Sequence, residues 1–322
     1  MQKDRIIGMF LGVAIGDSLG LCCEGWSAAK IKEVYGRITF HHEPKSHNLK
    51  IGSTSDDTQL TLAVAEAILE DNLSMESQVK HHIAAFQETT AGWGNTTRDS
   101  VRRLANGANW ASSGNGSSGL GNGVAMKIAP MGVYLCSVHP DRQKLTEGIE
   151  HITKINLMTH RTSVSASAAL AHAFGIYYCC TLDDPKDFSV DKFQKMIIKA
   201  SSIGRQMFAE TLTDDITNRF EVLFQKEHDT QKLIDDFGGG SCYCYNSLPF
   251  SYGFFLQNPN SIESLYNVVN AGGDTDSNAS MVGALLGALH GTSIFPEHLI
   301  GGLVDVDKVL AVAERFAEKF AT

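Results

Sequence analysis

Glycines at every fourth position constrain this chain more than any other feature of its sequence. They occur near the start at Gly8, Gly12, Gly16 and Gly20, and near the end at Gly283, Gly287 and Gly291. Residues four apart share one face of a helix, so each series predicts a helix with one side free of side chains. A glycine inside a helix costs about 1 kcal/mol relative to alanine, which requires a compensating close contact. We therefore expect the two helices to lie side by side at the centre of the molecule.

The composition is that of a globular chain with a large core. It has 322 residues, 43% of them hydrophobic, and no segment resembles a linker, so we expect a single domain over residues 1–322. The 27 basic and 36 acidic residues give a net charge of −9. This charge argues against a broad nucleic-acid surface or an anionic membrane as partner. We expect a monomer.

Cysteine usage and the N-terminal run bear on the compartment. The seven cysteines show neither a disulfide framework nor the paired CxxC spacings of a zinc ribbon, so a reducing cytoplasm suits them best. Lys3 and Arg5 precede an apolar run over 6–15 that could imitate a signal peptide, but Asp17 interrupts the pattern and no cleavage site of small residues follows. The run is too short to span a bilayer. We expect a cytoplasmic protein.

Helical periodicity recurs along most of the chain, and alternating strand patterns are nearly absent. Beyond the glycine helices, we expect helices at 28–35, 74–88, from 99 to 104, 142–152, 163–180, 191–209, 215–225, 261–269 and 304–320. The predicted fold class is therefore all-α, a compact helical domain with a cleft where helix N-termini meet.

Two acidic clusters stand where apolar helices begin. Residues 53–58 (STSDDT) precede one such helix, and residues 272–277 (GGDTDS) precede the helix with the second glycine series. Serine and aspartate are good N-caps and favour the positive end of the helix dipole, which would explain either cluster alone. Two clusters in one acidic chain favour a site of oxygen ligands, which suits Mg²⁺, Ca²⁺ or Mn²⁺.

Several other polar residues admit two interpretations. The glycine-rich stretch 112–123 could be a flexible link, but its second half, 118–123, could present backbone N–H groups to phosphate or ribose oxygens in front of a helix. Glu24 is either a solvated loop residue or a partly buried acid with a raised pKa. His160, at an expected helix start, would by its chemistry alone be a capping or packing residue.

A zinc site is a further interpretation of the loop at 41–47. It contains His41, His42 and His47, but no cysteines or regular spacing accompany them. We therefore do not favour zinc there.

Five motifs, in this order, resemble those of the ADP-ribosylglycohydrolases, which remove ADP-ribose from modified proteins and include the enzyme that reactivates dinitrogenase reductase. They are residues 8–20 (GMFLGVAIGDSLG), 55–58 (SDDT), 121–126 (GNGVAM), 159–160 (TH) and 272–277 (GGDTDS). The resemblance spans nearly the whole chain. It implies the orthogonal multi-helix fold of that family.

The resemblance also implies a site. Its metal ligands would be Ser55, Asp56, Asp57, Asp274, Asp276 and Ser277, holding two Mg²⁺ ions, with Mn²⁺ as a substitute. Its ADP-ribose contacts would be Ser118, Gly119, Gly121, Asn122, Gly123 and His160, and Glu24 would act in bond cleavage. Many members have threonine at the first and last ligand positions, and serine is more mobile than β-branched threonine. Gly92 and Trp93 stand where some relatives carry a carboxylate, whose role is not carried over.

The expected function is a Mg²⁺-dependent hydrolase that removes ADP-ribose from modified proteins. ADP-ribosyl-arginine is the expected linkage, because an acidic mouth would attract its cationic guanidinium leaving group. ADP-ribosyl-serine, poly(ADP-ribose) and O-acetyl-ADP-ribose remain alternatives, since the same motifs would serve them all. A non-catalytic binding or immunity protein on the same fold is a further alternative, which the intact acidic clusters disfavour.

Overall fold

A computed structural model of the protein describes residues 1–45, 48–208 and 214–321. Within these residues the regular structure is helical, without a strand, and two isolated bridges join Ser27 to Gly272 and Gly121 to Tyr243. The prediction of an all-α fold is confirmed.

The α-helices follow one another along the chain. They are α1 (Lys3–Gly20), α2 (Ala28–Tyr35), α3 (Asp56–Asp71), α4 (Met75–Glu88), α5 (Asn95–Ala105), α6 (Trp110–Ser113), α7 (Ala129–Val138), α8 (Arg142–Thr159), α9 (Ser163–Thr181), α10 (Val190–Gln206), α11 (Ile216–Phe224), α12 (Thr230–Asp236), α13 (Cys244–Gln257), α14 (Glu263–Asn270), α15 (Thr275–His290), α16 (Glu297–Ile300) and α17 (Val306–Phe320).

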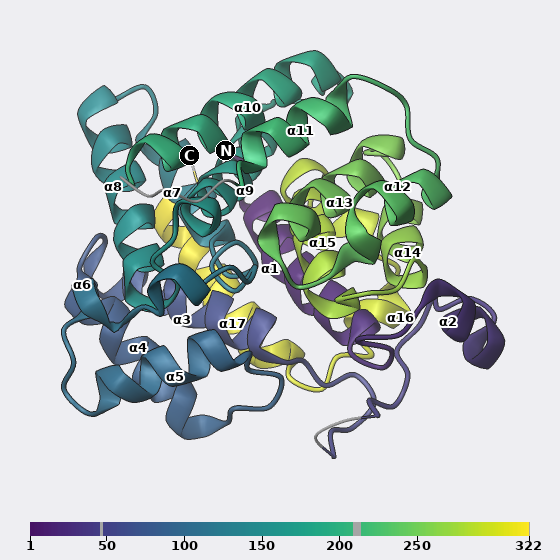
Figure 1. Ribbon diagram of the computed structural model, residues 1–322, viewed down its shortest axis with the longest axis horizontal. Coiled ribbons are helices and arrows are strands. Elements are labelled where there is room, and N and C mark those ends of the chain that lie inside the picture. Colours follow the sequence, from purple (N-terminus) through teal and green to yellow (C-terminus); the bar gives the residue numbers. More distant parts are fainter. Residues whose placement is uncertain (46–47, 209–213, 322) are drawn as a thin grey trace.

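Helices α1 and α15 form the centre of the molecule, where Figure 1 shows them side by side. They run antiparallel, because Gly8 faces Gly291 and Gly20 faces Asp276. A Cβ added at Gly12 would lie 2.0 Å from the carbonyl oxygen of Gly283. The two backbones are therefore in direct contact, as the glycine spacing predicts.

The other helices pack around this pair. Helices α3 and α17 contact α1, whereas α9, α13 and α14 contact α15. Nearly every residue of α1 and α15 is buried, and the buried apolar side chains of the molecule form one continuous cluster. As a result, the N-termini of α3 and α15 meet at the C-terminal end of α1.

Several helix boundaries differ from the prediction. Helix α8 continues to Thr159, seven residues beyond the predicted end, and α5 begins at Asn95, before the predicted start. Both differences involve residues with modest helix propensity, and packing against neighbouring helices outweighs that preference. The helix expected over 191–209 corresponds to α10, which ends at Gln206, and residue 209 lies outside the described residues.

The zinc interpretation of the loop at 41–47 finds no support in the residues that the structure describes. The ring nitrogens of His41 lie 2.9 Å from Ser18 Oγ and 2.8 Å from the carbonyl oxygen of Leu299, so both are engaged within the fold. His42 packs between the rings of Tyr35 and Phe40, and His47 lies outside the described residues.

All seven cysteines fall in the described part of the chain and are free thiols. No helix in the described ranges is long and apolar enough to cross a membrane.

Candidate active site

Asp17 joins the two acidic clusters to the central helix pair. It lies near the C-terminal end of α1, is fully buried, and accepts hydrogen bonds from Ser55 N (2.9 Å), Ser55 Oγ (2.7 Å) and Thr58 N (3.0 Å), as well as from Thr58 Oγ1. These donors are the free backbone N–H groups and hydroxyls at the start of α3. Asp17 therefore fixes the N-terminus of α3 beside the end of α1.

Glu24 is brought to the same place by two backbone hydrogen bonds. Gly25 N donates to the carbonyl oxygen of Gly273, and Gly273 N donates to that of Trp26, each at 2.8 Å. This pairing holds the turn after α1 against the turn before α15. Glu24 consequently stands next to Asp274, at the solvent-exposed side of the acidic residues.

The two acidic clusters form one group, as the sequence predicts. Carboxylate oxygens of Asp17, Asp57 and Asp276 lie within 4.8 Å of one another, and so do those of Glu24, Asp274 and Asp276. Asp276 belongs to both sets and links them. Residues that are more than two hundred positions apart in the chain thus share one site, because the N-termini of α3 and α15 both lie at the C-terminal end of α1.

Burial and mutual repulsion favour the protonated form of these acids. Burial, followed by the charges of Asp17 and Asp274, raises the pKa of Asp56 to about 8. Partial burial, followed by the charge of Asp274, raises the pKa of Glu24 to about 7. The pKa values of Asp57 and Asp276 are also raised well above the usual range, with burial the largest cause. A bound cation would offset the repulsion between these groups and favour their ionised form instead.

The donor set fits a hard divalent cation. Asp57 Oδ1 is buried without a hydrogen-bond partner, which leaves an oxygen for a metal, while Asp57 Oδ2 accepts from Ser277 Oγ at 3.2 Å. The hydroxyl of Ser55 donates to Asp17, so its lone pairs stay free. Carboxylates and hydroxyls without nitrogen or sulfur donors suit Mg²⁺ or Mn²⁺.

Asp17 was not predicted as part of this ligand set, although its carboxylate lies within reach. Both of its oxygens already accept hydrogen bonds from the first turn of α3. We interpret Asp17 as the anchor that orients Ser55 and the two aspartates that follow it. The signal for this role was its position in the first motif, nine residues after Gly8.

The glycine segment 118–123 lies against His160. A Cβ at Gly123 would fall 2.9 Å from His160 Cε1, and a Cβ at Gly119 would fall 1.9 Å from the carbonyl oxygen of His160. Ser118 is exposed at the start of the segment. The helix expected directly after it begins only at Ala129, because residues 123–127 form turns.

Asn122 is directed toward the acidic group. Its amide nitrogen donates to Asp274 Oδ2 at 2.6 Å and to Ser247 Oγ at 3.0 Å. Both amide hydrogens are thus engaged within the protein, and contact with a ligand would involve its remaining oxygen or its backbone.

His160 ends a helix instead of starting one. It is the residue after α8, is 1% exposed, and has its Nδ1 2.9 Å from Thr159 Oγ1. Burial, followed by the charge of Lys127, lowers the pKa of His160 to about 3, so its ring is neutral. The helix expected over 163–180 does begin at Ser163, but His160 lies before it as the C-cap of α8, and Arg161 between the two helices has a positive φ of 62°.

Lys127 is a functional candidate that the sequence analysis missed. It is fully buried, and its Nζ has no hydrogen-bond partner within the described structure. Burial lowers the pKa of Lys127 to about 7, while the negative charge of Asp56 opposes this shift. It therefore lies where it can offset part of the negative charge of the acidic group. Its signal was a lysine in an apolar stretch directly after the 121–126 motif.

Gly92 and Trp93 form one wall of the site. Gly92 has a φ of +80°, and a Cβ there would lie 2.9 Å from Asp56 Oδ1. Trp93 points into the core, where its Nε1 donates to Gln59 Oε1 at 2.7 Å. Where some relatives carry a carboxylate, this chain thus has only backbone against Asp56.

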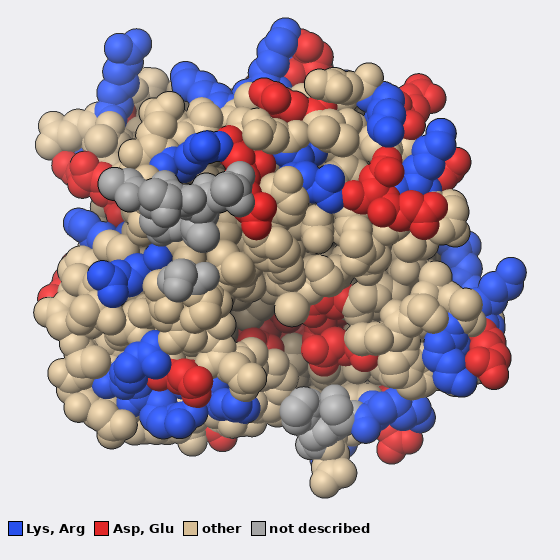
Figure 2. All heavy atoms as spheres, viewed as in Figure 1, with Lys and Arg blue, Asp and Glu red and all other residues tan. Residues whose placement is uncertain are grey.

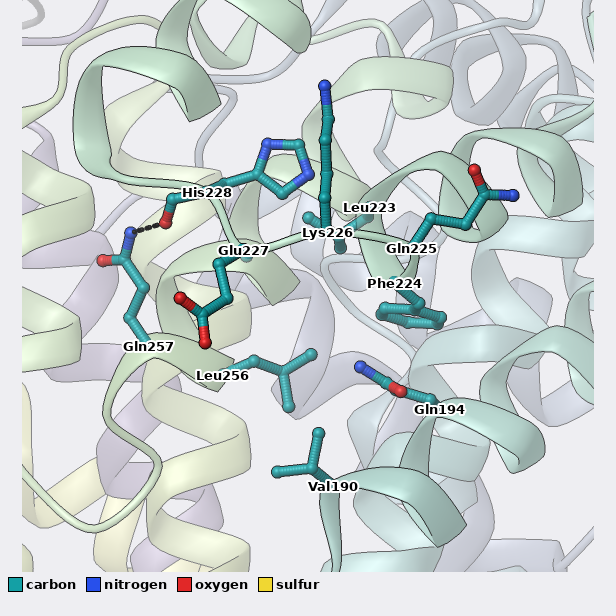
Figure 3. A pocket seen from close by; sticks show the side chains of 11 residues that line it. Val190, Gln194, Leu223, Phe224, Gln225, Lys226, Glu227, His228, Leu256 and Gln257 are labelled. Atoms are coloured by element: carbon teal, nitrogen blue, oxygen red, sulfur yellow. Dashed lines mark hydrogen bonds between the residues drawn. The ribbon is translucent and has the colours of Figure 1, made fainter.

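The acidic group opens to solvent through a hollow. Figure 2 shows acidic side chains at the floor of a hollow in the middle of one face. A separate cavity of about 610 Å³ lies at α10, α11 and α13, lined by Gln194, Phe224, His228, Leu256 and their neighbours (Figure 3). It contains none of the clustered carboxylates, so its size alone does not make it the active site.

Comparison with known proteins identifies the family. Residues 1–322 match the ADP-ribosylglycohydrolase family along their whole length. The chain belongs to this family. Membership supports a hydrolase that acts on ADP-ribose linkages, and it confirms the resemblance seen in the five motifs.

Individual relatives of this ADP-ribosylglycohydrolase are distant. The ADP-ribosyl-[dinitrogen reductase] glycohydrolase of Rhodospirillum rubrum is 23% identical, with 91% of this chain and 88% of that protein covered. The ADP-ribosylarginine hydrolase Tri1 of Serratia proteamaculans is 21% identical, with 97% and 78% covered. A solved ADP-ribosylglycohydrolase-related protein complex is 22% identical and superposes with a TM-score of 0.75 over 98% of both chains, which shows the shared fold.

Proposed function

We propose that this ADP-ribosylglycohydrolase is a metal-dependent enzyme that removes ADP-ribose from modified proteins, with ADP-ribosyl-arginine as its substrate. The observation that supports it most is the convergence of the two acidic clusters on Asp276, with an unpartnered carboxylate oxygen on Asp57. A non-catalytic binding protein would have no need for so many buried carboxylates, which destabilise a fold unless a cation neutralises them.

The proposed metal ligands are Asp56, Asp57, Asp274 and Asp276, completed by the hydroxyls of Ser55 and Ser277. Two Mg²⁺ ions are proposed, with Mn²⁺ as a substitute. When bound, such ions would hold and polarise ribose hydroxyls and a water molecule. The chain's own contribution is to hold these oxygens in place through Asp17 and the backbone contact of α1 with α15.

Glu24 is the proposed proton carrier. Its pKa of about 7 means that both forms are populated near neutral pH, which suits a general acid or base. It is the exposed member of the acidic group, so a protein side chain can reach it. We propose that Glu24 transfers a proton as the bond from ribose C1 to the modified side chain breaks, while positive charge develops on the sugar.

The glycine segment 118–123 and His160 are the proposed contacts for ADP-ribose. Ser118, Gly121 and Gly123 would offer backbone N–H groups to its oxygens. The N–H groups of Gly119 and Asn122 already donate to the carbonyl oxygens of Gly116 and Cys242, so these two residues would contact ADP-ribose through other atoms. The neutral ring of His160 packs against this segment.

The arginine linkage is supported by charge and by a relative. The acidic floor and the net charge of −9 would attract a guanidinium leaving group, whereas a serine hydroxyl gains nothing from that field. The name of the Serratia relative specifies ADP-ribosylarginine.

A side-by-side assay tests the linkage. Proteins carrying ADP-ribose on arginine or on serine are incubated with the enzyme, with Mg²⁺ or with a chelator, and ADP-ribose release is measured at low and high salt. We expect a higher kcat/KM for the arginine conjugate, an advantage that shrinks as salt screens the field. Equal or faster cleavage of the serine conjugate at low salt would refute the arginine assignment, and activity unaffected by the chelator would refute the metal.

A further inference from the structure

A chain of buried hydrogen bonds links the proposed ligand Asp274 to the glycine segment. It starts at Asn122, whose amide nitrogen donates to Asp274 Oδ2 (2.6 Å) and to Ser247 Oγ (3.0 Å). Ser247, in the first turns of α13, donates onward from its hydroxyl to Asn278 Oδ1 at 2.7 Å. Three elements distant in sequence, the glycine segment, α13 and α15, thus meet at two side chains.

Asn278 closes this chain into a ring. Its amide nitrogen donates to the carbonyl oxygen of Gly240 at 2.6 Å. The same oxygen accepts a hydrogen bond from Asp274 N at 2.9 Å. The backbone N–H of Asn278 donates directly to the carbonyl oxygen of Asp274 at 3.0 Å, and its side chain is connected to Asp274 by two further routes, one through Gly240 and the other through Ser247 and Asn122.

Hydrogen-bond donation in the ring runs from the amide of Asn122 to the carbonyl oxygen of Gly240 along both arms. Ser247 and Asn278 are completely buried and Asn122 is 5% exposed, so water does not compete for these bonds. Each amide donates with its nitrogen, and each oxygen in the ring accepts from a defined donor. Buried networks of this kind are rigid, because leaving one partner unsatisfied costs a desolvation penalty. A shift of Asp274 is thus transmitted to Asn122.

We propose that Asn278 is a positioning residue that couples the metal site to the ADP-ribose segment. Its buried side chain hydrogen-bonds to Ser247, Ser251 and Gly240, so it acts through Asp274 and Asn122. The inference rests on the proposed function, since it assumes that Asp274 binds metal and that residues 118–123 bind ADP-ribose. Metal binding then strengthens ADP-ribose binding through the ring, and the reverse holds by the same factor.

The test uses variants that cut the ring at different points. Ser247→Ala removes the hydroxyl between Asn122 and Asn278. Asn278→Asp keeps the shape of the side chain and its acceptor oxygen but removes the donor to Gly240. Ser251→Ala is the matched control, because Ser251 Oγ also lies 3.1 Å from Asn278 Oδ1 but is outside the ring. Thermal denaturation verifies that each variant folds. If Asn278→Asp does not fold, Ser247→Ala alone tests the proposal.

The measurement is the calorimetric dissociation constant of ADP-ribose with Mg²⁺ and with a chelator. We expect Mg²⁺ to tighten ADP-ribose binding about fivefold or more in the wild type, a typical size for coupling between sites. The ratio should fall in Ser247→Ala and Asn278→Asp, to the part that direct contact between metal and ribose would supply, and stay at the wild-type value in Ser251→Ala.

Two kinds of failure are distinguishable. A ratio that keeps its wild-type value in Ser247→Ala would overturn the coupling. So would an equal fall of the ratio in Ser251→Ala, or a ratio of one in the wild type. Each of these results leaves the proposed function standing. A wild-type protein that binds neither Mg²⁺ nor ADP-ribose would overturn the proposed function, and the inference with it.

Discussion

Glu24 and its acidic neighbours show how one residue's chemistry depends on those around it. Glu24 is exposed, yet partial burial of its carboxyl and the charges of Asp274 and Asp17 raise its pKa to about 7. Asp56, Asp57 and Asp276 are buried, and they fit metal binding better than proton transfer. Position within the group thus separates the proton carrier from the ligands.

Replacing Glu24 by glutamine tests that separation. Glutamine keeps the size of the side chain and removes the exchangeable proton, so kcat should fall by about 10²-fold or more while ADP-ribose affinity changes little. Single-turnover kinetics and calorimetry on the same preparation provide both quantities. A parallel loss of rate and ADP-ribose affinity would instead make Glu24 a binding residue.

The sequence was sufficient to find the candidate ligands and insufficient to assign every role near them. Hydroxyls and carboxylates at helix starts marked the clusters because chemistry and local structure coincide there. Lys127 escaped notice because lysines are normally exposed, and the apolar stretch around it does not by itself show that its side chain is buried. Asn122 was predicted to contact substrate, and only the folded chain places its amide on Asp274.

At the scale of elements, α1 and α15 carry the site because their backbones touch. Every fourth residue of α1 from Gly8 to Gly20 faces the backbone of α15 or of Gly291 just after it, so the contact extends along the whole of both helices. The acidic ends of α15 and α3 are held together through this contact with α1 and by the hydrogen bond from Ser277 to Asp57. A change that separates α1 from α15 should therefore destabilise the fold and disrupt the site together.

A single methyl group at Gly12 should disrupt the pair. The Cβ of Gly12→Ala would meet the carbonyl oxygen of Gly283 at 2.0 Å, so the helices must separate, at a cost of about 3 kcal/mol or more, the upper part of the range for overpacked cores. Urea unfolding measures this loss. Gly94→Ala is the control, since a Cβ there meets nothing within 4 Å and should cost about 1 kcal/mol or less. Equal stability of the two variants would contradict the close-contact account.

Helix α13 shows where prediction from the sequence fails. Its segment contains Pro249, which lacks an N–H group and normally argues against a helix interior. The helix forms because residues 247–255 are buried against α11, α14 and α15, and that packing outweighs the lost hydrogen bond. The periodic helices α2, α4 and α9 were predicted closely, since one apolar face or a continuous apolar run suffices to mark them.

At the scale of the whole molecule, the helices surround an acidic hollow, and the stability of the fold depends on pH. The folded-state pKa values of Asp56 (about 8) and Glu24 (about 7) are raised above those of the unfolded chain. Each raised group contributes stability that is fully present below its unfolded pKa and is lost as pH rises through its folded pKa. Without metal, these two groups therefore weaken the fold between about pH 4 and pH 8.

Metal should reverse this trend. Ligands must lose their protons to bind Mg²⁺, so binding strengthens as pH rises. We expect the increase in Tm caused by Mg²⁺, relative to chelator, to grow between about pH 5.5 and about pH 8.5. Differential scanning calorimetry at several pH values measures it. A shift that is constant or that shrinks with pH would show that the titrating carboxylates do not bind the metal.

The central claim is that two acidic clusters, one near each end of the chain, form a single metal site. Calorimetric titration of Mg²⁺ into the wild type, Asp57→Asn and Asp276→Asn tests it most directly, with Asp99→Asn, in α5 and paired with Arg102, as the control. The account predicts that both site variants weaken divalent binding alike and that the control does not. Wild-type binding in either site variant would show that the clusters are independent and would contradict the account.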